Sequence, residues 1–155
     1  MPAGLVAADI SPGWCVLVPL CGALAIAIAG RGATAENRLQ QNIREAITLA
    51  TAGTLLWLVC QFWTLAEAGQ APIFDHVEFL PGMPMAFQVE PLGMIYALVA
   101  SSLWILNSLY SIGYMRGNRE KHQTRFYVCF ALSIASVMGI AFAANMFTLF
   151  VFYEA

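Results

Sequence analysis

One carboxylate near the C-terminal end of the sequence is the residue best placed for chemistry. Glu154 closes the apolar run "FTLFVFYEA", residues 147–155, which holds no basic side chain. A charged side chain deep in a bilayer costs at least about 2.5 to 3.5 kcal/mol, so such residues are rare and usually serve a transport path. Proton binding or a cation on another helix would relieve this cost. Glu154 is therefore predicted to be a proton-exchanging site, and a neutral Glu hydrogen-bonded to a neighbouring helix is the structural alternative.

The other polar side chains in apolar segments predict contacts between helices. Asn107 and Gln61 carry amides of the kind that bind transmembrane helices together, and Asn107 could also hold a water molecule in a proton path. Glu90 precedes Pro91, a pair typical of a helix start, because proline is tolerated at the first helical position and an acid favours the helix dipole.

No metal or cofactor site is predicted. His76 lies beside acids and His122 beside Lys121, so both are interpreted as surface groups. The four cysteines lie in apolar runs without the spacing of a metal site, and are expected to be small buried hydrophobes. They are Cys15, Cys21, Cys60 and Cys129.

Composition assigns the chain to the membrane. Of its 155 residues, 60% are hydrophobic and 10% charged, and a mean hydropathy of +0.71 is far from that of a soluble domain. A net charge of -2 gives no basic surface for nucleic acid. Asp9 and the lack of a basic residue before the first apolar run argue against a cleaved signal peptide, so that run is expected to be retained.

The apolar runs predict an all-α, polytopic transmembrane protein with one helical region over residues 1–155. A helix needs about 20 residues to cross an apolar layer about 30 Å thick. Four runs reach this length and a fifth is incomplete. The chain is therefore interpreted as a truncated part of a longer polypeptide or as a naturally split subunit. The predicted spans are 12–30, 43–66, 91–115 and 126–144, followed by 145–155. Glu154 would then lie about 13 Å into the layer, near its middle.

The basic residues predict the orientation. All seven lie around the first and third loops, namely Arg31, Arg38, Arg44, Arg116, Arg119, Lys121 and Arg125. By the positive-inside rule the N-terminus and the 67–90 loop lie outside. Within this loop "FDHVEF" is predicted to be a strand.

Small residues recur every four positions along the fourth predicted span. They are Ala131, Ala135, Gly139 and Ala143. Such a stripe is typical of close helix packing in lipid. The fifth helix is its expected neighbour, because the connecting loop is almost absent.

Three stretches together resemble a known family. They are "FQVEPLGMIYALVASSLWILNSLYSIGYMRGN", "KHQTRFYVCFALSIASVMGIAFAANMFTLF" and "VFYEA". They are similar to the N-terminal part of the antiporter-like membrane subunits of respiratory complex I, membrane-bound hydrogenases and Mrp-type cation/proton antiporters. The residues of the first two stretches are most similar to the D-subunit group of the Mrp-type proteins. The resemblance is strong over 90–155 and extends to the first two helices in hydropathy only.

The resemblance implies a function. In that family a Glu on the fifth transmembrane helix is central to the proton path and pairs with a Lys on a later helix, and "FVFYEA" places Glu154 on that position. The chain would be a proton-translocating part of a multisubunit antiporter or redox-driven pump in the bacterial inner membrane. It would move protons alone or exchange them for Na+ or K+. No cofactor is expected on this chain. An accessory or structural membrane subunit without transport chemistry is the alternative.

Overall fold

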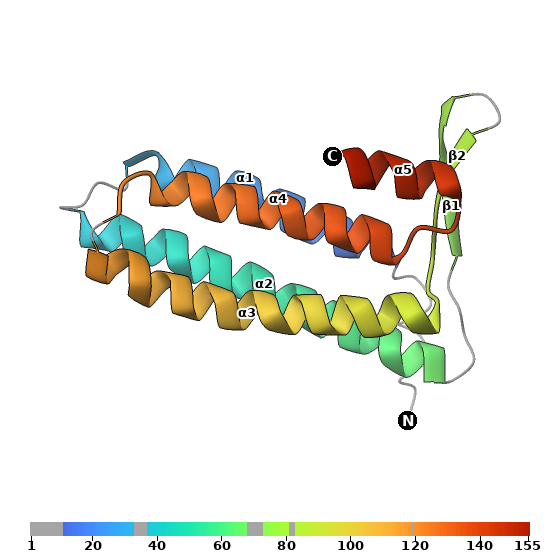
Figure 1. Ribbon diagram of the computed structural model, residues 1–155, viewed down its shortest axis with the longest axis horizontal. Coiled ribbons are helices and arrows are strands. Elements are labelled where there is room, and N and C mark those ends of the chain that lie inside the picture. Colours follow the sequence, from blue (N-terminus) through green and yellow to red (C-terminus); the bar gives the residue numbers. More distant parts are fainter. Residues whose placement is uncertain (1–10, 33–36, 68–72, 81–82, 119) are drawn as a thin grey trace.

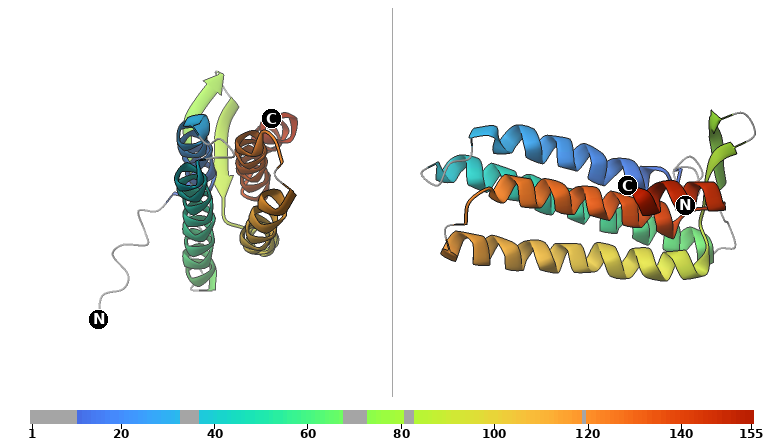
Figure 2. Two further views of the ribbon diagram at one scale, coloured as in Figure 1. Left: turned by 90° about the vertical axis from the view of Figure 1, so that its left-hand side faces the viewer. Right: turned by 45° about the horizontal axis from the view of Figure 1, so that its top comes forward.

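Four antiparallel helices form the body of the molecule. The computed structural model describes residues 11–32, 37–67, 73–80, 83–118 and 120–155. The long helices lie side by side around a ring in chain order, with the fourth returning against the first (Figures 1 and 2). They are α1 (Trp14–Ala29), α2 (Arg38–Glu67), α3 (Pro91–Asn118) and α4 (Gln123–Ala141). The smaller elements are a 3-10 turn η1 (Gly30–Gly32), strands β1 (Ile73–Leu80) and β2 (Met83–Gln88), and helix α5 (Met146–Glu154).

The predicted class, a polytopic helical membrane protein, is confirmed. Helices α2, α3 and α4 are each long and apolar enough to cross a bilayer. Helix α1 is apolar but has 16 residues, about 24 Å of helix, which is shorter than the run 12–30 suggested. It starts two residues later because Pro12 and Gly13 form a turn ahead of Trp14.

Two helices are longer than their apolar runs. Helix α2 begins at Arg38 rather than near residue 43, and α3 continues to Asn118 rather than ending near residue 115. The added turns carry Arg, Gln and Asn, which are polar but fit a helix that emerges from an apolar layer. Helix α3 begins at Pro91, as the Glu90–Pro91 pair predicted.

The two ends of the bundle differ in charge. The α1–α2 and α3–α4 connections share one end, and the described basic residues all lie in these connections or in the helical turns next to them. We call it the basic end. The start of α1, the β-hairpin and the start of α5 lie at the opposite end, the hairpin end (Figure 1). This separation is what the orientation argument required.

Strands β1 and β2 form an antiparallel hairpin between α2 and α3. Its first strand contains the "FDHVEF" segment, so the predicted strand is confirmed. The pairing runs from Ile73 opposite Gln88 to Leu80 opposite Met83, with irregular register on both sides of the Val77–Glu78 segment.

The core of the bundle consists of large apolar side chains from all four long helices and from β2. Trp104 of α3 is 1% exposed, and Phe62 of α2 lies with its ring centroid 6.2 Å from that of Phe142, at the end of α4. Burial of such side chains is the main stabilising term where they meet inside the protein. This packing fixes the hairpin end, where α5 begins.

Candidate functional site

The segment between α4 and α5 pairs with β2 through two backbone hydrogen bonds and one isolated bridge. Gln88 N–H donates to the Phe142 carbonyl at 2.8 Å, and Ala144 N–H donates to the Ala86 carbonyl at 2.9 Å. Phe87 and Ala143 face each other as an antiparallel bridge. Helix α4 therefore ends at Ala141, and not at residue 144 as predicted, because β2 takes up the backbone hydrogen bonds of the following residues.

Side chains fix the first turn of α5 to the same strand. Asn145 caps the helix, since its Oδ1 accepts from Thr148 N–H at 2.7 Å, while its Nδ2 donates to the Pro84 carbonyl at 2.7 Å. The fully buried Thr148 accepts a hydrogen bond from Ala86 N–H on Oγ1 at 3.0 Å. The helix that carries Glu154 is thus anchored at its start by β2.

Further along, α5 packs on α4 through one aromatic side chain. The Phe152 ring lies against Gly139, where any Cβ would overlap the ring. The same ring lies 5.7 Å from that of Phe87 between centroids. Of the small-residue stripe, Gly139 thus has the predicted neighbour. Ala143 lies instead in the segment that pairs with β2.

Glu154 lies on the face of α5 that this chain leaves uncovered. Thr148 and Phe152 are one turn apart and face the bundle. The exposed residues of α5 lie on the other side, with Met146 80% exposed, Phe150 60% and Tyr153 73%. At about 100° per residue, Glu154 shares this exposed face and lies well away from the direction of Phe152. It is exposed, and within the described part of the chain it forms no hydrogen bond or ion pair.

The structure places Glu154 relative to the bundle. The predicted depth counted nine residues from the outer end of α5 itself, and α5 starts beyond the end of α4, beside the hairpin (Figure 1). Phe152 is therefore level with Gly139, which is only two residues before the last residue of α4. The C-terminal end of α5 consequently lies alongside the outer part of α4 and not at the midpoint of the bundle (Figure 2).

A buried charge cluster at the basic end was missed in the sequence. Glu45 of α2 is 4% exposed and accepts from Arg116 of α3 on both carboxylate oxygens, with the Nε–Oε1 distance at 3.1 Å. Arg116 also donates to Asn42. The cluster therefore joins α2 to α3 by a charge-assisted pair inside the protein.

Arg44 extends this cluster to α4. It is 1% exposed, and its guanidinium donates to Gln123 Oε1 at 2.8 Å, Thr124 Oγ1 at 3.2 Å and Glu45 Oε1 at 3.3 Å. Its charge lies 5.0 Å from the ring centroid of the buried Tyr127. Two buried atoms here have no partner among the described residues, Arg44 Nε and Tyr127 Oη.

The signal for this cluster is present in the sequence but supports two interpretations. Arg44 and Arg116 are among the basic residues that predict the orientation in the membrane. The positive-inside rule counts such residues without regard to which side chains are buried. The adjacent Arg44–Glu45 pair just inside an apolar run is the available hint, since neighbouring opposite charges at a helix end can be buried together.

Other predicted residues have simpler places. Asn107 and Gln61 are half-buried, and neither side chain forms a hydrogen bond to another residue in the described ranges, so the expected amide contacts are not formed there.

Of the four cysteines only Cys15 is buried, and the expectation of burial is wrong for the other three, which lie on outward-facing sides of their helices. The His122 side chain is exposed, as predicted, and that residue precedes α4 with a left-handed φ of 60°. The His76 side chain lies outside the described part.

The fold defines a helical membrane protein, and comparison with known proteins narrows this class. No family model matches the chain. It is 24% identical over 145 residues to NAD(P)H-quinone oxidoreductase subunit 5 of the Paulinella chromatophora chromatophore, covering 89% of this chain and 22% of that relative. It is 30% identical over 73 residues to the Na(+)/H(+) antiporter subunit A1 of Staphylococcus aureus, covering 47% of this chain and 9% of that relative.

These matches confirm the resemblance at the level of the family. The chain is a homologue, at low identity, of the antiporter-like subunits of complex I-type and Mrp-type membrane complexes. It spans about a fifth of the length of the relatives it matches over most of its own sequence. The likeness to the D-subunit group does not agree with these relatives, which are quinone oxidoreductase subunits of type 5 and an antiporter subunit of type A1.

Proposed function

We propose that this chain takes part in proton translocation within a multisubunit membrane complex, and that Glu154 is its intramembrane proton-exchanging carboxylate. The observation that carries the proposal is the position of Glu154 on the uncovered face of α5, a helix anchored by Thr148 to β2 and packed by Phe152 on α4. An anchored helix holds its carboxylate at a fixed place, which proton transfer between side chains requires.

The carboxylate needs a partner from outside the described helices. Tyr153 and Phe150 flank it with apolar surface, and a charge facing lipid is costly. A cation on a further helix, packed over the exposed face of α5, would stabilise the ionised form. Protonation of Glu154 would then weaken that attraction and change the proton affinity of the cation, so the two groups titrate together. Repeated along a row of polar sites, such coupling moves protons.

The proposal has two branches for the driving reaction. One is exchange of protons for Na+ or K+, and the other is a redox-driven pump of the complex I or hydrogenase type. In both, the chain works with other membrane subunits, and the basic end lies on the cytoplasmic side of a bacterial plasma membrane. The alternative is an accessory subunit that only stabilises the complex, and it predicts that Glu154 can be neutralised without loss of proton movement.

The test uses the full-length subunit with its complex in inverted membrane vesicles. Glu154→Gln keeps the size and polarity of the side chain and removes its ionisation. We expect this variant to lose at least about 90% of proton movement, since a required proton-transfer group typically contributes 100-fold or more. Assembly, followed on a native gel, should be unchanged. Addition of Na+, K+ or NADH in the wild type identifies the driver.

Glu120→Gln is the matched control, because Glu120 is an exposed acid at the basic end. It should translocate protons like the wild type. Wild-type proton movement in Glu154→Gln would remove this residue from the path. If the complex also fell apart when the chain was deleted, the hypothesis of an accessory subunit would replace the proposal.

A further inference from the structure

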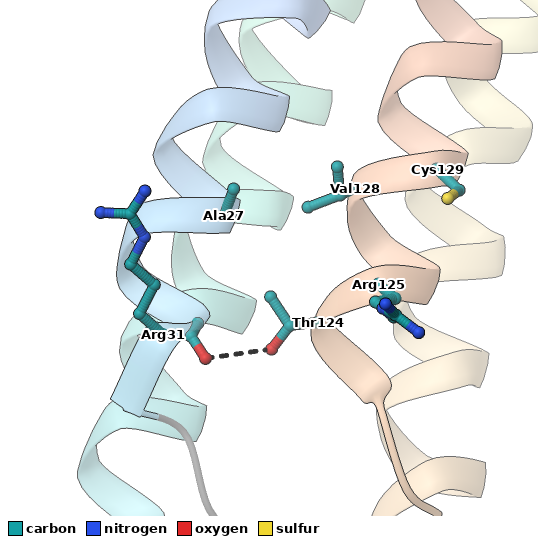
Figure 3. A pocket seen from close by; sticks show the side chains of 7 residues that line it. Ala27, Arg31, Thr124, Arg125, Val128 and Cys129 are labelled. Carbon is teal, nitrogen blue, oxygen red and sulfur yellow. Dashed lines mark hydrogen bonds between the residues drawn. The ribbon is translucent and has the colours of Figure 1, made fainter.

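A groove runs between α1 and α4 at the basic end of the bundle. Its volume is 550 Å³, and its lower border is the hydrogen bond from Thr124 Oγ1 to the Gly30 carbonyl, at 3.4 Å (Figure 3). The walls are small or apolar side chains, and one arginine stands on each side. The lining residues are Ala27, Gly30, Arg31, Thr124, Arg125, Val128 and Cys129.

Each wall repeats the same order of chemistry. On α1 the helical spacing of 3 and 4 residues aligns Ala27 with Leu24, and Arg31 follows in the 3-10 turn η1, at the basic end. On α4 it aligns Arg125 with Cys129 and then with Leu132. Both stripes therefore begin with a cation at the basic end and continue as apolar surface, and Leu24 is 67% exposed and Leu132 43%.

The two arginines beside the groove differ from the buried pair nearby. Arg44 and Arg116 are held by Glu45 and by polar side chains. Arg31 and Arg125 are exposed, and within the described ranges neither forms an ion pair or a side-chain hydrogen bond. In Figure 3 the Arg31 side chain, from η1, extends to the side facing away from α4, and the Arg125 side chain lies on α4. Both guanidiniums are thus on exposed side chains at the basic end.

We propose that this groove binds an anionic phospholipid of the cytoplasmic leaflet. The phosphate would lie at the mouth between Arg31 and Arg125, whose planar guanidiniums suit phosphate oxygens. One acyl chain would follow the apolar walls past Ala27 and Val128. Basic pockets between transmembrane helices on the cytoplasmic side are suited to such headgroups. The proposal uses neither Glu154 nor proton transfer, so it stands or falls separately from the proposed function.

The charge pattern favours a lipid over a protein segment. A protein occupant would need acidic side chains at the mouth and an apolar helix along both walls, whereas a single phospholipid combines the two. The small and apolar side chains along both walls also suit an acyl chain. Both arginine side chains would rotate to reach the phosphate, at the cost of some rotamer freedom.

The experiment is native mass spectrometry of the full-length subunit in its complex, with phosphatidylglycerol and phosphatidylcholine of the same chain length added in turn. We expect retention of phosphatidylglycerol by the wild type, and a loss of about tenfold or more in its affinity in the double variant Arg31→Gln/Arg125→Gln, since each cation near an anionic headgroup contributes. The matched control is Arg38→Gln, an exposed arginine outside the groove, and it should bind like the wild type.

A second variant tests the walls with both charges in place. Cys129→Trp puts a large side chain at an exposed position of the groove, and it should also weaken phosphatidylglycerol binding. Unchanged binding in the double variant, or equal binding of phosphatidylcholine by the wild type, would overturn the proposal. Loss of a neighbouring subunit from the double variant, with lipid retained, would instead make the groove a subunit contact and also overturn it.

Discussion

The carboxylate of Glu45 on α2 accepts hydrogen bonds on both oxygens from the guanidinium of Arg116 on α3. This pair closes one end of the bundle, opposite the hairpin from which α5 extends. Its two members are unequal, because the Glu45 side chain is 5% exposed and that of Arg116 is 43% exposed. The acid is therefore part of the protein interior, and the base reaches it from the surface.

The unequal burial predicts unequal effects of substitution. Glu45→Ala leaves Arg44, which is 1% exposed, without its carboxylate partner, and removing one partner of a buried pair costs about 3 to 5 kcal/mol. Arg116→Ala leaves Glu45 with Arg44 as its partner and removes a half-exposed cation, so about 1 kcal/mol is expected. The free energy of unfolding of the full-length subunit in mixed detergent micelles measures both.

Glu120→Ala is the control for this comparison, since its exposed carboxylate makes no ion pair within the described residues. It should change the unfolding free energy by less than about 0.5 kcal/mol. Equal costs for Glu45→Ala and Arg116→Ala would contradict the assignment of Glu45 to the interior.

A second prediction concerns the contact that holds α5 on α4. Gly139→Ala places a Cβ inside the volume of the Phe152 ring, and overpacking of this kind costs about 1 to 3 kcal/mol. Gly113→Ala meets no atom within 4 Å, so there the gain in helix propensity should leave stability unchanged or slightly raised. The two substitutions are chemically identical, and opposite signs in thermal unfolding would identify the close contact as the cause.

A double variant adds a sharper test of the same contact. Phe152→Ala removes the ring that the new methyl group would meet, so Gly139→Ala should cost little in that background. The interaction energy of the double-mutant cycle should then be about 1 kcal/mol or more. An additive pair would mean that the two residues are not in contact.

The sequence predicted the helices well because each is a long apolar run, and length alone separates such a run from loop. It predicted the ends of these helices poorly. At residues 142–144 the backbone could continue α4 or pair with a strand, and only the presence of β2 decides between them. Hydropathy carries no information about such long-range hydrogen bonds.

Glu154 was identified in the sequence because an acid in an apolar run is rare. The place of α5 relative to α4 could not be predicted. The predicted depth counted residues from the outer end of α5, and the sequence does not show where that end lies relative to α4. The anchoring of Thr148 and Asn145 to β2 places that end beyond α4, and these contacts join residues more than 60 positions apart. For the same reason the buried cluster at Glu45 was missed, since its partners come from three helices.

The last prediction tests whether β2 sets the position of α5. Thr148→Val keeps the shape of a fully buried side chain but removes the oxygen that accepts from Ala86 N–H. A buried donor left without a partner costs about 1 to 3 kcal/mol, and the first turn of α5 should open more often.

Thr54→Val is the matched control, because its exposed hydroxyl donates only to the Ala50 carbonyl of its own helix at 2.8 Å. Amide hydrogen exchange at Ala86 should rise at least tenfold in the first variant and stay unchanged in the second. Unchanged exchange in both would mean that α5 is positioned by Phe152 and Asn145 alone, and the proposed rigid placement of Glu154 would then depend on the α4 contact rather than on the hairpin.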